Sequence, residues 1–300
     1  MIASSTTSTA ASARMRARRI QTSKTHERVR RVTNGVMLGL TGLATLLALI
    51  PLVWIIVDVV LRGAQYLTWN FLTQTFKPTS LGGGGVYHAI VGTLILVGLA
   101  SLMSIPLGIL AAFYVVRNPN SPISLIVRFG TDVLSGLPSI VVGLFVYTLL
   151  VAGRSYSAFS GGVALAIMML PIVLRTTEEM LKLVPRSMRE GALGLGAPEW
   201  KSSLNVLLPA ALTGVVTGLM LAVARVAGET APLLFTAQGS NVLSTSLDKP
   251  IASLPLTLYK YAIDPDKTRN GQAWAIALII VIIVLALNIG ARLLARRRMR

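Results

Sequence analysis

Two arginines stand inside apolar stretches of this sequence, and each has an acidic residue about one helical turn away. Arg225 precedes Glu229 by four residues, and Thr230 follows directly. Residues four apart share one face of a helix. A planar guanidinium donates parallel hydrogen bonds to two oxygens of an oxyanion. We therefore predict that Arg225, Glu229 and Thr230 line a polar path for an oxyanion, with a purely structural ion pair as the alternative.

The second arginine is Arg175, which has Glu178 and Glu179 three and four residues further on. An arginine at the centre of a bilayer costs about 2.5–3.5 kcal/mol on insertion scales, so something must compensate it. Arg175 is a second candidate path residue. It could equally be a structural residue near the inner membrane surface beside Lys182. The two arginines fall at different depths, so one shared site is not assumed.

The remaining polar residues in or near apolar stretches have simpler interpretations. Asp58 and Arg62, four residues apart, suggest an interfacial pair, and Asp132 suggests a helix cap. His88 follows a run of four glycines and suggests a contact with lipid head groups. With no cysteine and only one other histidine, His26, a metal site is not expected. The sequence shows no catalytic constellation, so we expect a chain that is not itself an enzyme.

The elements that must position these residues are membrane helices. The chain has 300 residues, of which 53% are hydrophobic and 13% charged, whereas a soluble domain carries about 25% charged residues. A helix needs about 20 apolar residues to cross a bilayer. The sequence therefore predicts an all-α membrane protein with about six transmembrane helices, at residues 34–61, 86–116, 124–151, 161–183, 204–230 and 273–294.

The net charge of +17 gathers largely at the two ends of the chain. Basic residues that flank apolar spans fix orientation, and they favour anionic lipid. We therefore expect a multi-pass protein of the cell membrane with both termini in the cytoplasm, and no binding of nucleic acid. The predicted organisation is a basic, disordered cytoplasmic tail (1–33), a first transmembrane helix with its outer connection (34–85), a transmembrane core (86–295) and a basic cytoplasmic end (296–300).

Small residues and prolines indicate how the spans are shaped. Gly214 and Gly218 are four residues apart, a spacing that lets membrane helices approach closely. Pro138 and Pro171 are expected to bend their helices. In the first outer connection, the aromatic segment 68–76 is expected to lie on the membrane surface.

A glycine-rich, charged stretch at residues 190–209 separates the fourth and fifth spans. It lacks the lysine of a phosphate-binding loop. We interpret it as a short helix capped by Ser187, with Glu190 completing a capping box. Gly196 would take a left-handed conformation at the helix end, and Pro198 would begin the next helix. The glycines expose backbone for a close partner.

The same stretch resembles a family signature. Glu190-Gly191-Ala192, three residues, Gly196, nine residues and then Val206-Leu207-Leu208-Pro209 resemble the E-A-A-x3-G-x9-I-x-L-P signature of ABC importer permeases. Glycine stands at the second position and valine replaces isoleucine. The resemblance implies a type I ABC importer permease fold with a cytoplasmic coupling helix at about 187–197. The residues that it assigns to ATPase coupling are Glu190, Gly191, Ala192, Gly196, Leu208 and Pro209.

Further motifs are similar to those of the phosphate-specific ABC importer, namely GGGGVYHAIVGTL, LSGLPSIVVGLF, LPIVLRTTEEMLKLVP and ARVAGETAPLLFTA. This resemblance implies a permease subunit of an ATP-driven phosphate importer, and it implicates the arginines of the last two motifs in transport. The implied partners are a second homologous permease, two ATPase subunits and an extracytoplasmic phosphate-binding protein. ATP and Mg would belong to the ATPase partner, with no cofactor in this chain.

Three alternatives stay open. Permeases for molybdate or sulfate share the coupling signature. An ion-coupled secondary transporter would show inverted repeats with broken helices, and no clear repeat is visible. A non-transporting membrane scaffold would not need arginines in its spans.

Overall fold

The computed structural model describes the backbone of residues 5–297 and the side chains of residues 27 and 29–290. The chain divides into two units, residues 1–58 and 59–300. The predicted boundaries at 33/34, 85/86 and 295/296 stay predictions. Helix α1 runs from Ser5 to Tyr66 and makes up most of the first unit.

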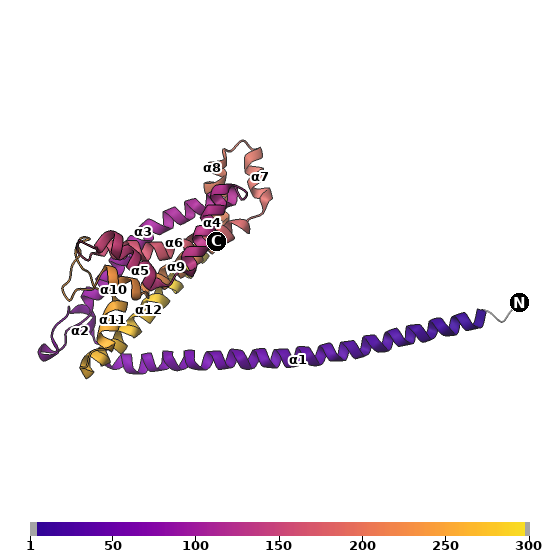
Figure 1. The fold of residues 1–300 in the computed structure, drawn as a ribbon, viewed down its shortest axis with the longest axis horizontal. Coiled ribbons are helices and arrows are strands. Elements are labelled where there is room, and N and C mark those ends of the chain that lie inside the picture. Colours follow the sequence, from indigo (N-terminus) through magenta and orange to yellow (C-terminus); the bar gives the residue numbers. More distant parts are fainter. Residues whose placement is uncertain (1–4, 298–300) are drawn as a thin grey trace. The chain divides into compact units, whose positions relative to one another are not determined.

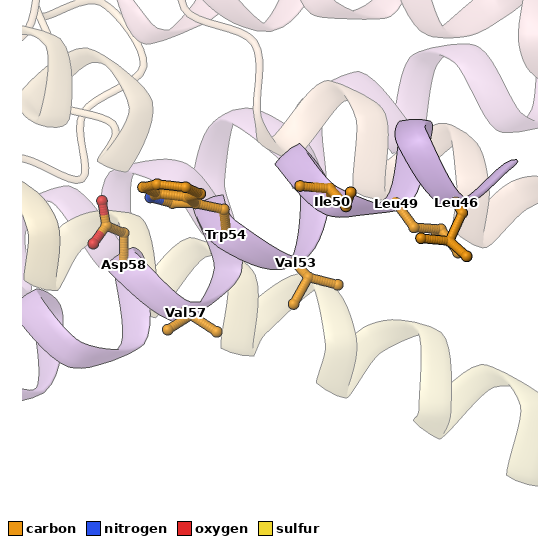
Figure 2. Close-up of a pocket in the computed structure, with 7 residues that line it drawn as sticks. All are labelled: Leu46, Leu49, Ile50, Val53, Trp54, Val57 and Asp58. Atoms are coloured by element: carbon orange, nitrogen blue, oxygen red, sulfur yellow. The ribbon is translucent and has the colours of Figure 1, made fainter. Parts of the chain in front are cut away.

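The first unit carries a shallow groove on α1 (Figure 2). Its volume is about 580 Å³, and its walls are apolar apart from one carboxylate, with Leu46, Leu49, Ile50, Val53, Trp54, Val57 and Asp58 as the lining residues. Such a surface offers no set of donors for an oxyanion. It suits lipid chains or an apolar helix.

The second unit is built from helices, and the described residues form no β-strand beyond two isolated bridges. After α1, the helices are α2 (Trp69–Thr73), α3 (Tyr87–Arg117), α4 (Pro122–Gly136), α5 (Ser139–Val146), α6 (Ala158–Lys182), α7 (Arg186–Gly194), α8 (Glu199–Ser202), α9 (Leu208–Ala227), α10 (Ala231–Thr236), α11 (Leu254–Ala262) and α12 (Lys267–Arg297). Within this unit, α7 and α8 lie at one end of the bundle, and α2 and α11 lie at the other (Figure 1).

Five helices are long and apolar enough to cross a membrane, and the bent pair α4–α5 makes up to six. This agrees with the predicted count. The third predicted span, 124–151, is the bent pair, whose two helices meet at an angle of 107°. Pro138 stands at that break as the N-cap of α5, as expected for a proline. By contrast, α6 continues through Pro171 without a break.

Helices α6 and α9 approach closely where the sequence places small residues. A Cβ added to Gly214 would collide with Met180, and one added to Gly218 would collide with Thr176. The predicted role of these two glycines is confirmed. The two contacts also fix the antiparallel register of the two helices. Gly218 lies four residues after Gly214 on α9, and its partner Thr176 lies four residues before Met180 on α6.

A second helix break lies between α9 and α10, at residues 228–230, where the span formed by α9 ends. The short helices after the two breaks, α5 and α10, pack against each other. A Cβ on Gly143 would lie 2.6 Å from the Cα atom of Pro232, so only glycine allows this approach. The bent span and the end of α9 are thus joined through α5 and α10.

The connection between α1 and α3 differs from its prediction in two ways. Thr68 caps α2 by accepting a hydrogen bond from the backbone N–H of Phe71, and Phe71 is buried. Only Trp69 projects as an interfacial residue would. His88 is also buried, so a contact with lipid head groups is wrong: the helix start packs inward instead.

A buried arginine, Arg269 of α12, ties this connection to the bundle. Its guanidinium donates hydrogen bonds to the carbonyl oxygens of Gly83 and Lys77 and to the Tyr261 hydroxyl. It also lies over the rings of Phe76 and Tyr261, at 4.5 and 4.6 Å. Burial raises the pKa of the Tyr261 phenol, and the Arg269 charge opposes that rise.

Candidate functional site

Arg225 lies in the last turn of α9, and Glu229 follows just beyond the helix end. Their atoms Nε and Oε1 are 3.9 Å apart, a loose ion pair. The Arg225 side chain is 62% exposed and that of Glu229 18% exposed. The predicted pairing is present, although Glu229 belongs to the break rather than to the helix. The guanidinium is therefore held only weakly and has free donors.

The break beside Arg225 is open. A Cβ on Gly228 would meet only the carbonyl oxygen of Arg225, at 3.6 Å. Thr230 begins α10, and its backbone carbonyl accepts from Leu233 and Leu234. No partner for the Thr230 hydroxyl occurs among the residues described. Among the described residues, Arg225 and Thr230 thus offer polar groups that are not fully paired, at the end of the span formed by α9.

Arg175 does not pair with Glu178 or Glu179, as its sequence neighbourhood suggested. Its Nη2 atom lies 3.1 Å from Oδ1 of Asp132 on α4, and both side chains are about half exposed. Asp132 stands well inside α4, which begins at Pro122. The prediction that Asp132 caps a helix is therefore wrong: it serves as the counter-charge of Arg175.

Glu178 is buried and forms a second link between α4 and α6. Its Oε1 atom lies 2.9 Å from Nη2 of Arg128 and 2.6 Å from Nζ of Lys182. The Nε atom of Arg128 also donates to this oxygen, at 3.0 Å. The role of Arg128 was missed from the sequence. The sequence feature that could have indicated this role is the four-residue spacing of Arg128 and Asp132 at the start of an apolar span.

The register of α6 and α9 gives the relative depth of the two arginines. Arg225 lies seven residues beyond Gly218, so it is level with about Met169, seven residues before Thr176. Arg175 is six residues from Met169, or about 9 Å along the helix. The two guanidinium groups therefore belong to different levels of the bundle, in line with the sequence.

The two ion pairs between α4 and α6 set a second antiparallel register. Extended to the end of α4, it places Gly136 level with about Pro171, close to the level of Met169 and Arg225. Arg225 therefore lies at about the depth of the α4–α5 break.

The glycine-rich stretch contains the second half of α7, all of α8 and the turn that leads into α9, so a short helix forms there as the sequence suggested in outline. Gly196 has φ of +82°, the left-handed conformation expected of it. The predicted cap is wrong: Pro185 precedes the first turn, no side chain caps it, and Ser187 lies inside the helix. Pro198 precedes α8 by one residue instead of beginning it.

No residue of α7 is buried. Leu195 at its end is 92% exposed, and Met188 and Trp200 are also exposed. A Cβ at Gly191 or Gly194 would meet nothing within 4 Å among the described atoms. The segment is therefore a charged projection with exposed apolar side chains and accessible backbone, as a docking element requires.

Ion pairs hold the base of this projection. Glu199 at the start of α8 pairs with Arg117 at the end of α3, and its Oε1 atom lies 4.0 Å from Nη2 of Arg189 on α7. A π-helical turn at residues 203–207 then leads into α9. Pro209 lacks an N–H and crowds the carbonyl four residues earlier, and a widened turn accommodates both effects.

Glu179 faces a different neighbourhood from the ion pairs. It lines a cavity of about 450 Å³ between α6, α9 and α12, together with Thr176, Met180, Thr213, Gly214, Thr217, Gly218, Met220, Leu221 and Asn288. Among the described residues, no three His, Asp or Glu side chains gather as metal ligands.

In the second unit, four apolar helices long enough to span a membrane and the bent pair α4–α5, with arginines among them and an exposed helix at one end, are typical of a membrane transport subunit. The family described as the binding-protein-dependent transport system inner membrane component matches residues 104–300, more than half of the chain. The chain belongs to this family, and it is a multi-pass membrane protein.

Among similar proteins is the phosphate transport system permease protein PstA of Yersinia pestis, which is 42% identical over 90% of this chain and 92% of its own. The phosphate transport system permease protein PstA 1 of Mycobacterium tuberculosis (strain H37Rv) is 39% identical over 90% of this chain and 91% of its own.

Solved structures share the fold at lower identity. The MetNI methionine ABC transporter in an inward-facing conformation matches with a TM-score of 0.58 at 20% identity, over 72% of this chain and 95% of that chain. A bacterial alginate ABC transporter, in complex with its alginate-bound periplasmic protein, matches with a TM-score of 0.64 at 16% identity, over 89% and 96%. The expected type I ABC importer permease fold is confirmed.

Proposed function

We propose that this chain is a permease subunit of an ATP-driven phosphate importer and that Arg225 stands in its translocation path. The observation that carries the proposal is the exposed Arg225 guanidinium inside a membrane span, held by Glu229 only at 3.9 Å. A charge in a span needs a polar surrounding. A path for an oxyanion supplies one, and relatives about 40% identical carry the name of a phosphate transport permease.

The roles of the site residues follow from this proposal. Arg225 donates to phosphate oxygens, Glu229 holds the guanidinium between transport events, and Thr230 adds a hydroxyl at the same break. Arg175, about 9 Å away along the bundle, forms a second station, where Asp132 competes for the guanidinium. A carboxylate beside each arginine keeps binding weak enough for release, as conduction requires.

The exposed helix α7 is the proposed coupling helix. In this role Glu190, Gly191, Ala192 and Gly196 meet a groove of an ATPase subunit, and Leu208 and Pro209 connect the helix to α9. In this role α7 and both termini face the cytoplasm. The rest of the proposed assembly is a second homologous permease, two ATPase subunits that hold ATP and Mg, and an extracytoplasmic phosphate-binding protein. The 1–33 tail and the 296–300 end would face anionic lipid.

Substrate competition tests the proposed function. Membrane vesicles that carry the complete complex are supplied with ATP and labelled phosphate, alone or with an excess of sulfate or molybdate. Uptake is expected to need ATP and to resist both competitors. Displacement by sulfate or molybdate would identify a different oxyanion importer. Uptake that follows an ion gradient without ATP would identify a secondary transporter.

A further inference from the structure

The ion pairs between α4 and α6 are arranged in a way that allows only one register. Arg128 and Asp132 share one face of α4, and Arg175 and Glu178 share one face of α6. Because the helices are antiparallel, Arg128 meets Glu178 and Asp132 meets Arg175. Both pairs combine opposite charges in this register alone.

A shift of α4 by one turn would be opposed in either direction. In one direction Asp132 would take the place of Arg128 and face Glu178, carboxylate against carboxylate. In the other, Arg128 would take the place of Asp132 and face Arg175, cation against cation. Glu178 is 2% exposed, so solvent would screen such a contact poorly. The fixing of register is the best-attested role of buried charges.

The two locked helices connect distant parts of the unit. Three residues separate the end of α6 at Lys182 from the start of α7 at Arg186. At its other end, α4 leads into the break before α5, and α5 packs against α10 next to Glu229 and Thr230. A movement of α7 can pass to α9 directly, through α8 and through the crossing of α6 and α9. It reaches the break from the side of α5 only if α4 and α6 do not slide past each other.

We propose that Arg128 and Glu178 are positioning residues that lock α4 to α6, so that the movement of α7 is delivered to the break beside Arg225. This inference rests on the proposed function. Helices in other proteins shift past one another by one turn during switching. Here the charge order excludes that shift, and α6, α4 and the projection formed by α7 move as one body.

The test replaces the ion pair by a removable bridge. The natural chain contains no cysteine, so Arg128→Cys with Glu178→Cys introduces the only two thiols of this subunit. The complete complex, with its ATPase subunits and loaded binding protein, is reconstituted before and after treatment with a short bifunctional thiol reagent. Phosphate transported per ATP hydrolysed is measured. Treated natural chain and the two single variants serve as controls.

Without the bridge, the ratio of phosphate to ATP is expected to fall by about tenfold, within the range of couplings between distant sites. With the bridge, it should return toward the ratio of the natural chain. An unbridged variant with the natural ratio would overturn the proposal. So would loss of transport on bridging, because α4 and α6 would then have to slide.

A second variant covers the case in which the first does not assemble. Arg128→Glu, Glu178→Arg and Lys182→Glu together keep every ion pair at Glu178 with its signs exchanged. In this variant, a shift of α4 by one turn would bring the Asp132 carboxylate to the positively charged side chain at position 178. That contact is attractive, so the charges no longer allow only one register. We expect an assembled complex with a lowered ratio of phosphate to ATP, and a natural ratio would refute the lock. Absence of phosphate uptake by the natural chain would instead contradict the proposed function.

Discussion

The charged residues in the spans differ in how tightly they are held. Glu178 receives Arg128 and Lys182 in a buried setting, whereas Arg225 reaches Glu229 only at 3.9 Å and is largely exposed. A buried pair resists separation because each partner would be left desolvated and uncompensated. A loose, exposed pair opens at little cost. The tight cluster suits a structural role, and the loose pair suits a role in binding.

Sequence reasoning predicted the ion pair of Arg225 correctly but not that of Arg175; the roles of both residues in a path stay predictions. Arg225 and Glu229 are neighbours in sequence, so their pairing could be predicted. The partner of Arg175 is Asp132, which lies 43 positions earlier on another helix. Glu178 and Glu179 are nearer to Arg175 in the sequence, so they were the more obvious candidates for its partner. The packing of helices that are distant in sequence decides between such candidates. A single sequence does not show which helices pack together.

Arg269 gives a prediction on stability. Arg269→Gln should destabilise the complex by about 2–5 kcal/mol, because buried carbonyl oxygens of Gly83 and Lys77 lose a charged donor. Arg269→Lys should destabilise the complex nearly as much, because an ammonium group cannot stack on Phe76 and at the same time donate hydrogen bonds in several directions. Thermal unfolding of the purified complex measures both effects. A lysine variant as stable as the natural chain would show that charge alone matters there.

Among the elements, the spans and the projection of α7 could be predicted, but not all of their ends. Long apolar stretches and the left-handed Gly196 are local signals. Ser187 does not cap α7, because Pro185 ends the preceding turn and starts the helix earlier. The α9–α10 break at Gly228 had a local signal that was not used, because Pro232 stands in the first turn of α10. It depends on the packing of α10 against α5, which is a tertiary contact.

The close crossing of α6 and α9 gives a second prediction. Gly218→Ala should destabilise the protein by about 1–3 kcal/mol, because its methyl group collides with Thr176. Gly98 of α3 provides the control: a Cβ there meets nothing within 4 Å. Gly98→Ala should be neutral or stabilising by up to about 1 kcal/mol. Thermal unfolding of both variants measures this difference, and equal effects would contradict the crossing.

Helix α7 gives a prediction on assembly. Leu195→Asp should weaken the association with the ATPase subunits by about 10- to 30-fold, the loss of one apolar anchor of about 2 kcal/mol. Val242→Asp, also at an exposed position but in the loop before α11, should leave association unchanged. Co-purification titrated with the ATPase subunit measures the effect. Unchanged binding of the Leu195 variant would remove α7 from the docking surface.

At the scale of the whole molecule, the α4–α5 break lies at about the depth of Arg225, and α5 packs against α10. The proposed lock between α4 and α6 connects this region to α7 at the end of the bundle. In the proposed function, this arrangement separates the site for an oxyanion from the docking site for the driving partner and links the two mechanically. Composition and spacing predicted both candidate sites, which stay predictions, whereas the proposed link between them required the structure.

The most direct measurement is ATP-dependent phosphate uptake by vesicles that carry the complete complex, with Arg225→Gln compared with the natural chain. Arg154→Gln, in the exposed connection before α6, is the matched control, and assembly is checked in parallel. Loss of a charged donor to phosphate is worth about 1.5–3 kcal/mol, so uptake should fall by about tenfold or more, with assembly and the Arg154 variant unaffected. Uptake unchanged by Arg225→Gln would contradict the account, because Arg225 would then lie outside the path.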